Sequence, residues 1–270
     1  MSSPVSRRTV LAGTAAVAAA GAAVAASAAP AAAGGKGPKP TIVLVHGAFA
    51  DATGWSEVIK RLTHDGYPVL APPNPLRGVV SDSAYLASFL KTVPGPIVLV
   101  GHSYGGVVIT NAATGNKNVK ALVYVAAFAP AAGDTVVGLQ NQFPGTELHL
   151  EQIDFRPYEI PGVKSVDGYV KKDVFRFIFA GDLPRSTTDI MWATQRPGDG
   201  GTLQEPSGDP AWAAIPSYFL VAREDKLIPP AAQRFMAQRA GSHVVEVKAS
   251  HVAMISQPRI TADLIRKAAR

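Results

Sequence analysis

The stretch VLVGHSYGGVVI, residues 98–109, constrains the fold of this chain more than any other part of the sequence. A run of β-forming residues ends there and an apolar segment typical of a helix begins, with Ser103 at the junction. Glycine-x-serine-x-glycine between a strand and a helix is typical of a nucleophile elbow, which exposes a serine hydroxyl above a parallel sheet. A serine that merely occupies a glycine-rich turn is the alternative. The stretch therefore marks Ser103 as a candidate nucleophile.

Six short apolar runs along the chain are typical of strands buried on both faces. They alternate with segments whose apolar residues recur at helical spacing, such as Trp55, Val58, Ile59 and Leu62. This alternation predicts an α/β fold, with a mostly parallel sheet of about six strands flanked by helices. The six runs are residues 41–46, 67–72, 96–101, 120–128, 217–222 and 243–249.

Residues 131–215 interrupt the alternation. They are rich in proline, glycine, aspartate and aromatic residues, contain no pattern of a buried strand, and are far longer than an ordinary loop. We expect a helical cap inserted into a single domain of residues 34–270, with short helices at 171–180 and 186–193. Its larger apolar side chains are candidates for the roof of a pocket, although core packing explains them equally: Phe143, Tyr158, Tyr169, Phe175, Phe177, Phe179, Met191 and Trp192.

Residues 1–33 differ from the rest of the chain. Arg7 and Arg8 precede a run rich in alanine, glycine and valine, which small residues at 28–33 follow. This pattern predicts a twin-arginine export signal, and hence a protein exported to the cell envelope or the medium. A membrane anchor is the alternative, but the alanine-rich run is only weakly hydrophobic. We therefore expect cleavage and no stable membrane association afterwards.

The composition excludes several kinds of chemistry. The chain of 270 residues is 47% hydrophobic, enough to bury a large core, and contains no cysteine. It therefore has no disulfide, no thiolate metal ligand and no cysteine nucleophile. The net charge of +6 falls to +4 without Arg7 and Arg8, because 24 basic residues then face 20 acidic ones. This charge is too small to favour a nucleic-acid partner.

A nucleophile elbow predicts an acid and then a histidine, in that order, on loops that follow later strands. Asp225 follows the run at 217–222, and His251 follows the run at 243–249. Glu224 is the neighbouring competitor for the role of the acid. The other histidines fit less well, because they lie at a helix end, in the insertion, at the opposite edge of the sheet, or beside the oxyanion loops: His64, His149, His243, His46 and His102.

Two backbone N–H groups are candidates for an oxyanion hole. Tyr104 follows the candidate nucleophile and opens a helix, whose positive end favours negative charge. The second donor is expected from the loop after the first strand, where Gly47 permits a sharp turn and Ala48 follows it. Phe49 comes next and is a candidate lining residue of the pocket or a buried ring.

The motifs HGAF, GHSYGG, VYVAAFAP, REDKLIPP and KASHVAMISQP occur in that order over residues 41–270. In this respect the chain resembles the α/β-hydrolase superfamily, and most of all its small esterase branch of plant methylesterases, hydroxynitrile lyases and related bacterial secreted hydrolases. The resemblance implies Ser103 as nucleophile, His251 as base, Asp225 as its orienting acid, and Ala48 and Tyr104 as oxyanion donors. The lyase members typically lack the histidine–glycine turn, so Gly47 disfavours lyase chemistry.

These observations together predict a serine hydrolase of the carboxylesterase type. We expect it to cleave a small to medium hydrophobic ester or lactone through an acyl-enzyme on Ser103, with no cofactor and no metal. Two alternatives remain. One is a non-catalytic homologue that binds a small molecule, and the other is a cofactor-free haloperoxidase or perhydrolase that uses the same residues.

Overall fold

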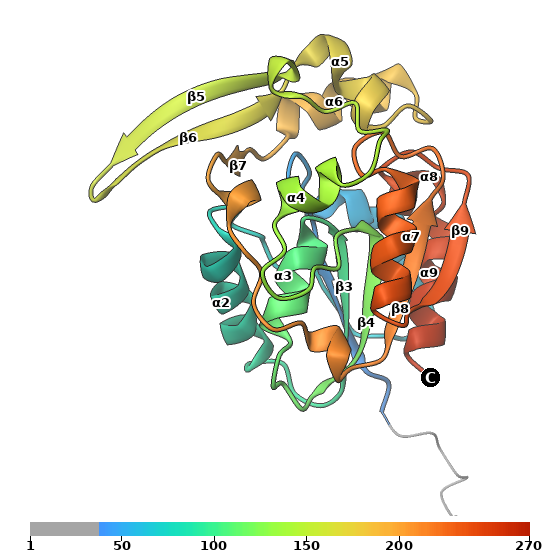
Figure 1. The fold of residues 1–270 in the computed structure, drawn as a ribbon. Helices are drawn as coiled ribbons and strands as arrows, with labels where there is room; N and C mark the ends of the chain where they lie inside the picture. Colours follow the sequence, from blue (N-terminus) through green and yellow to red (C-terminus); the bar gives the residue numbers. More distant parts are fainter. Residues whose placement is uncertain (1–37) are drawn as a thin grey trace, which may run out of the picture. The chain divides into compact units, whose positions relative to one another are not determined.

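The computed structural model of this protein describes residues 38–270 (Figure 1). The export signal predicted for residues 1–33 lies outside the described residues. Within residues 38–270, no helix combines the length and the apolar character that crossing a membrane requires.

A six-stranded sheet forms the centre of the described chain, in the order β2-β1-β3-β4-β8-β9. Every neighbouring pair in this sheet is parallel, which confirms the predicted architecture. The middle strands are buried on both faces, because helices cover them on either side. The strands are β1 (Thr41–Val45), β2 (Val69–Leu70), β3 (Ile97–Ser103), β4 (Val119–Ala127), β8 (Ser217–Ala222) and β9 (His243–Val247).

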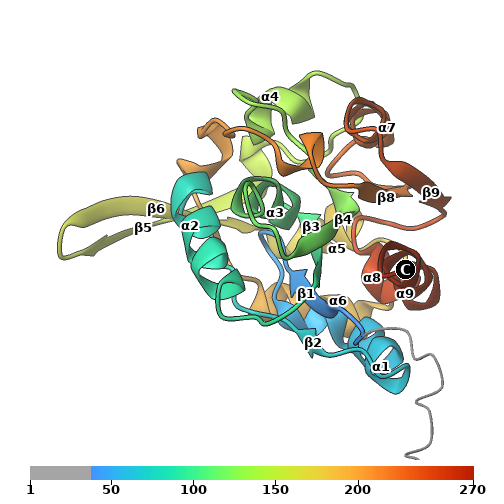
Figure 2. The ribbon, with the colours of Figure 1, turned by 90° about the horizontal axis from the view of Figure 1, so that it is seen from below.

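Helices cover both faces of this sheet (Figure 2). One face carries α1 (Ser56–His64), α8 (Ala253–Ser256) and α9 (Pro258–Ala268), and the other carries α2 (Val79–Leu90), α3 (Gly105–Ala112) and α7 (Pro230–Arg239). The predicted apolar stripe explains how α1 and the turn before it pack, because Trp55, Val58 and Leu62 are completely buried.

The insertion between β4 and β8 contains both predicted helices, at α5 (Lys172–Phe179) and α6 (Arg185–Thr194), together with α4 (Val136–Asn141). It is not wholly helical. A second sheet of three antiparallel strands joins β5 (Ile153–Ile160), β6 (Val163–Val170) and β7 (Gly198–Asp199).

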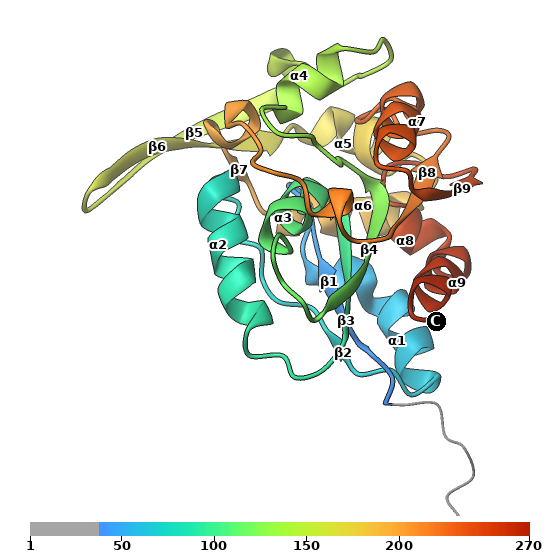
Figure 3. The ribbon, with the colours of Figure 1, turned by 60° about the horizontal axis from the view of Figure 1, so that its bottom comes forward.

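The hairpin of β5 and β6 was not predicted, for a physical reason. Figure 3 shows it projecting away from the central sheet, and most of its side chains are exposed or only partly buried. The strands therefore carry no buried apolar run, which was the signal used to find strands. Four short 3₁₀ helices complete the elements of residues 38–270: η1 (Ala52–Trp55), η2 (Leu150–Gln152), η3 (Thr202–Gln204) and η4 (Ala211–Ala213).

Parallel strands place their carboxyl ends at one edge of the sheet, where sites of this fold class form. Ser103 is the last residue of β3, and the loops that follow β1, β8 and β9 carry Ala48, Asp225 and His251. The cap follows β4 at the same edge (Figure 1). The topology thus gathers candidate residues from four distant parts of the chain.

Candidate active site

Ser103 occupies a strained turn at the junction of β3 and α3. Its φ angle is +53°, in the left-handed region that residues other than glycine rarely adopt. The turn is tight because glycines at two positions allow backbone segments to approach closely. A Cβ at Gly101 would lie 2.6 Å from the carbonyl oxygen of Gly105, and a Cβ at Gly105 would lie 2.5 Å from the carbonyl oxygen of Val45. The local geometry is that of the predicted elbow.

Gly47 allows the loop after β1 to approach the serine. A Cβ at Gly47 would lie 2.6 Å from Cβ and 3.1 Å from Oγ of Ser103, so no larger residue fits without movement. The side chain of Ser103 is therefore held against the loop that carries Ala48. Neither the Ala48 N–H nor the Tyr104 N–H donates a hydrogen bond to another group among residues 38–270. Both backbone groups remain available to a developing oxyanion.

Asp225 and His251 form a buried pair. The Nδ1 atom of His251 lies 2.7 Å from Oδ2 of Asp225, and both side chains are completely buried. The other carboxylate oxygen accepts the N–H groups of Leu227 at 2.8 Å and Ile228 at 2.9 Å. The amide of Gln233 donates to Oδ2 at 2.8 Å. The carboxylate is thus held in place by four donors.

This arrangement sets the tautomer of His251. The carboxylate can only accept, so Nδ1 carries the proton and Nε2 is left as the basic nitrogen. The Nε2 atom is buried and has no hydrogen-bond partner within the described part of the chain, Ser103 Oγ included. Attack by the serine therefore requires its hydroxyl to turn from Gly47 toward this nitrogen, a tightening that complexes with substrate commonly bring.

Glu224, the competing acid, points elsewhere. Its carboxylate lies 3.7 Å from Nζ of Lys248, and its side chain is 49% exposed. Asp225 is the acid that contacts the imidazole. The two residues are neighbours in sequence, but the turn after β8 directs only Asp225 inward.

His46 and Asn74 hold the loop of Ala48. The His46 ring places Nδ1 3.0 Å from the carbonyl oxygen of Gly47, while its Nε2 accepts the N–H of Asn74 at 3.1 Å. The Asn74 side chain also donates to the carbonyl oxygen of His46 at 2.9 Å. In a trans peptide the Gly47 carbonyl and the Ala48 N–H point in opposite directions, so fixing the first orients the second. Asn74 was not found from the sequence, because no motif connects it to this loop.

Tyr104 is anchored through its side chain. Its phenol donates to Oδ2 of Asp82 at 2.9 Å, and this completely buried carboxylate also accepts the N–H of Arg77 at 3.1 and 3.2 Å. Burial raises the pKa of Asp82 above its ordinary value, and these hydrogen bonds oppose the rise. Asp82 was also missed by the sequence analysis, because it lies in the first turn of α2 and far from every motif.

The cap lies over the candidate active site. Asp182, which follows α5, accepts the N–H of Ser250 at 3.0 Å and also its hydroxyl, and Ser250 directly precedes His251. The ring of Phe179 lies 5.0 Å from the ring of His251. As a result, Ser103 is 4% exposed and His251 is completely buried.

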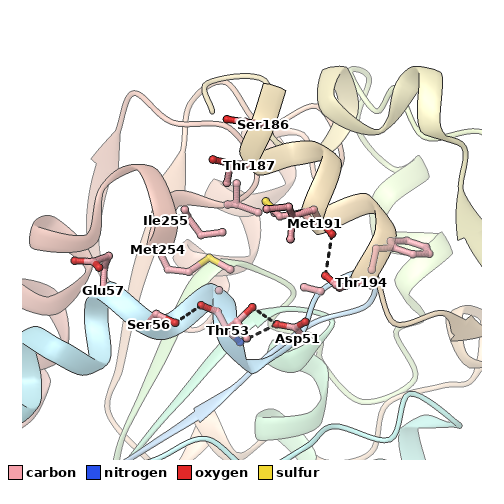
Figure 4. Close-up of a pocket in the computed structure, with 15 residues that line it drawn as sticks. Asp51, Thr53, Ser56, Glu57, Ser186, Thr187, Met191, Thr194, Met254 and Ile255 are labelled. Atoms are coloured by element: carbon pink, nitrogen blue, oxygen red, sulfur yellow. Dashed lines mark hydrogen bonds between the residues drawn. The ribbon is translucent and has the colours of Figure 1, made fainter. Parts of the chain in front are cut away.

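A cavity of about 340 Å³ lies beside this centre, between the cap helix α6 and the turns of η1 and α8 (Figure 4). Phe49 and Val252, which follow Ala48 and His251 in the sequence, belong to its wall. Ser103 and His251 themselves do not line it. The open space in the structure therefore adjoins the candidate catalytic residues without containing them.

His102 gives a prediction about stability. Its Nε2 donates to the carbonyl oxygen of His251 at 3.0 Å, and burial, aided by the nearby His251, lowers its pKa well below the ordinary 6.5. The unfolded chain therefore binds a proton below pH 6.5 that the folded protein does not, and the free energy of unfolding falls as the pH falls. His102→Gln removes the imidazole that binds this proton in the unfolded chain, and its amide keeps an N–H donor at this position.

We expect His102→Gln to flatten the dependence of the unfolding free energy on pH. Between about pH 5 and pH 6.5 the slope should decrease by up to about 1.4 kcal/mol per pH unit relative to the wild type. Urea unfolding followed by circular dichroism at several pH values measures both slopes. Parallel curves for the two proteins would show that His102 does not carry this proton linkage.

Comparison with known proteins agrees with this geometry. A model of the alpha/beta hydrolase family matches residues 42–264. The pyrethroid hydrolase of Sphingobium wenxiniae is 28% identical over 254 residues, which cover 83% of this chain and 85% of that protein. Methylesterase 1 of Arabidopsis thaliana is 24% identical over 255 residues, which cover 86% of this chain and 96% of that protein.

A solved structure shows the same fold. The crystal structure of polyneuridine aldehyde esterase has a TM-score of 0.74 and 20% identity, and the match covers 86% of this chain and 100% of that chain. The plant methylesterase agrees with the branch to which the sequence motifs point. With a family match over most of its length, an elbow serine and a buried acid–histidine pair, this chain belongs to the α/β-hydrolase family.

Proposed function

We propose that this protein is a serine hydrolase that cleaves a hydrophobic carboxylic ester or lactone through an acyl-enzyme on Ser103. The observation that carries the proposal is the buried hydrogen bond between Asp225 and His251, which leaves the Nε2 atom of His251 without a partner among residues 38–270. A serine at φ +53° and two available backbone N–H groups lie at the same sheet edge.

The first half of the proposed reaction forms the acyl-enzyme. Oγ of Ser103 attacks the ester carbonyl carbon while its proton passes to Nε2 of His251. The carbonyl oxygen becomes an oxyanion, which accepts hydrogen bonds from the N–H groups of Ala48 and Tyr104. The intermediate then collapses, the bond to the alcohol oxygen breaks, and the alcohol leaves with the proton from Nε2.

The second half releases the acid. A water molecule gives a proton to Nε2 of His251, and its oxygen attacks the acyl carbon on Ser103. Collapse of the second oxyanion returns the proton to Oγ and frees the carboxylic acid. Asp225 stabilises the imidazolium in both halves and keeps Nε2 directed at the substrate. In a lactone the alcohol and the acid remain in one product molecule.

The comparisons support ester substrates without naming one. The relatives are called a pyrethroid hydrolase and a methylesterase, and the structural neighbour is a polyneuridine aldehyde esterase. The apolar side chains of the cavity beside the triad of Ser103, Asp225 and His251 fit a hydrophobic substrate. The cap contact of Phe179 with His251 shields the reaction from bulk water.

A fluorophosphonate probe tests the proposal. We expect one probe per chain on Ser103, located by mass spectrometry of the digested protein, together with hydrolysis of p-nitrophenyl acetate that the probe abolishes. Labelling of a different residue would refute Ser103 as the nucleophile. Stoichiometric binding of a small ester without turnover of any member of an ester and lactone panel would instead indicate a binding protein.

A further inference from the structure

The cavity beside the reaction centre has an apolar interior. Met191 from α6, Met254 and Ile255 from α8, and Phe49 and Val252 from the loops of the reaction centre all line it. Figure 4 shows the labelled methionines and Ile255 meeting between α6 above and η1 below. Its volume of about 340 Å³ falls in the range of small-molecule pockets.

Several hydroxyl side chains and two carboxylates also line the cavity, and both carboxylates are already engaged. Asp51 accepts the N–H of Thr53 at 2.7 Å and also its hydroxyl, so this carboxylate caps η1. Glu57 lies 2.6 Å from Nζ of Lys60. Since no lysine or arginine belongs to the lining, the cavity offers no cation to an acidic ligand. Its chemistry fits a neutral, apolar group.

The wall of the cavity continues into the oxyanion loop. Phe49 follows Ala48, and its N–H donates to the carbonyl oxygen of Arg196 in the cap at 2.9 Å. Its ring meets the ring of Phe179 edge to face, with centroids 6.5 Å apart, and Phe179 in turn contacts His251. The Phe49 ring therefore borders both the cavity and the reaction centre.

We propose that this cavity receives the apolar acyl chain of the substrate, an assignment that rests on the proposed function above. The carbonyl oxygen of the acyl group is held at the Ala48 N–H, so the acyl chain starts beside Phe49, the residue that borders the cavity. The alcohol must instead leave past Nε2 of His251, which protonates it. The substrate class is then an ester or lactone with an extended, neutral acyl chain.

Gly54 is the position from which the cavity is best filled. A Cβ at Gly54 would lie 3.2 Å from Cε of Met254 and 3.7 Å from the Cδ1 atom of Ile255, so a side chain there enters the cavity. The φ angle of Gly54 is not in the left-handed region, which leaves the backbone free to accept leucine. Gly54→Leu therefore occupies the proposed acyl site without touching the triad.

The test compares p-nitrophenyl octanoate with p-nitrophenyl acetate. We expect Gly54→Leu to lower kcat/KM for the octanoate at least about tenfold. Its kcat/KM for the acetate should stay within about threefold of the wild type, because only the longer acyl chain needs the space that the leucine fills. Gly201→Leu is the matched control, since Gly201 is exposed, lies outside the cavity lining and has a φ of −78°. Gly201→Leu should keep the wild-type ratio of the kcat/KM values for the two substrates.

A second variant guards against misfolding of the first. Ile190 lines the cavity and is 66% exposed, so Ile190→Trp narrows the mouth from the surface of α6 and should also reduce octanoate turnover selectively. The acyl assignment would be overturned if both variants kept the wild-type ratio of kcat/KM for the octanoate to kcat/KM for the acetate. It would also be overturned if they lost kcat/KM equally for both substrates. A selective loss of kcat/KM for octyl acetate, whose long chain is on the alcohol, with none for the octanoate would overturn it too. A wild-type protein that hydrolyses no ester and takes no fluorophosphonate would overturn the proposed function as well.

Discussion

Ser103→Ala is expected to lower kcat for p-nitrophenyl acetate on the order of a millionfold, and to abolish fluorophosphonate labelling. The substitution removes the attacking oxygen but leaves the backbone donors of Ala48 and Tyr104 in place. Residual turnover then comes only from binding and from the oxyanion donors. Removal of the His251 imidazole should cause a loss of similar size, because the serine and the histidine act as a unit.

Ser83→Ala is a matched control for this experiment. Ser83 lies on α2, is 7% exposed, and its hydroxyl has no hydrogen-bond partner in the described part of the chain. The control should keep wild-type turnover and labelling. Both variants should unfold at nearly the wild-type urea concentration, since each removes one oxygen atom. If Ser103→Ala kept more than about 1% of the wild-type kcat, the acyl-enzyme on Ser103 would be refuted.

Asp225→Asn is expected to lower kcat about ten-thousandfold. The N–H groups of Leu227 and Ile228 require an oxygen at Oδ1, so the new NH₂ group must face His251 and Gln233. The Nδ1 atom of His251 then has to accept instead of donate, which transfers its proton to Nε2 and removes the base. The Gln233 amide also faces a second donor, and the lost hydrogen bond should lower the free energy of unfolding by about 1–3 kcal/mol.

Glu224→Gln separates this effect from a change of surface charge. Glu224 is half exposed and faces Lys248, so its substitution should leave kcat within about twofold of the wild type, as surface changes away from the site generally do. Steady-state kinetics and urea unfolding of the two variants provide the comparison. Near wild-type turnover in Asp225→Asn, with a collapse in Glu224→Gln, would exchange the roles assigned to the two acids.

The framework of the fold followed from local patterns. Each central strand is a continuous apolar run that helices bury on both faces, and each run lies close to its predicted position. The elbow was also predicted from a local pattern, because the close backbone approach at this turn leaves no room for a Cβ at Gly101 or Gly105. Parallel connectivity then places the loops after the strands at one edge, which is why Asp225 and His251 could be predicted as a pair from their order in the chain.

The supporting residues did not follow from local patterns, because their roles arise from contacts between distant segments. Asp82 meets Tyr104 across two helices, and Asn74 meets His46 across two loops. Asp182 reaches Ser250 from the cap. In the sequence each of these residues resembles an ordinary polar surface residue. Burial distinguishes Asp82 and Asn74, whereas the exposed Asp182 is distinguished only by its partner. The β5–β6 hairpin was not predicted for a different reason, since it buries few side chains on either face and so has no buried apolar run.

The sequence by itself determined the parallel sheet, the elbow at Ser103 and the chain order of Asp225 and His251, because strand periodicity and glycine turns are local properties. Only the tertiary structure showed which of Asp225 and Glu224 contacts the imidazole, since adjacent residues in a turn point in different directions and Asp225 alone reaches the ring. It also created the cavity beside Phe49, whose wall comes from three segments far apart in the chain. Shape and direction of this kind arise from packing between elements, and no single stretch of sequence contains them.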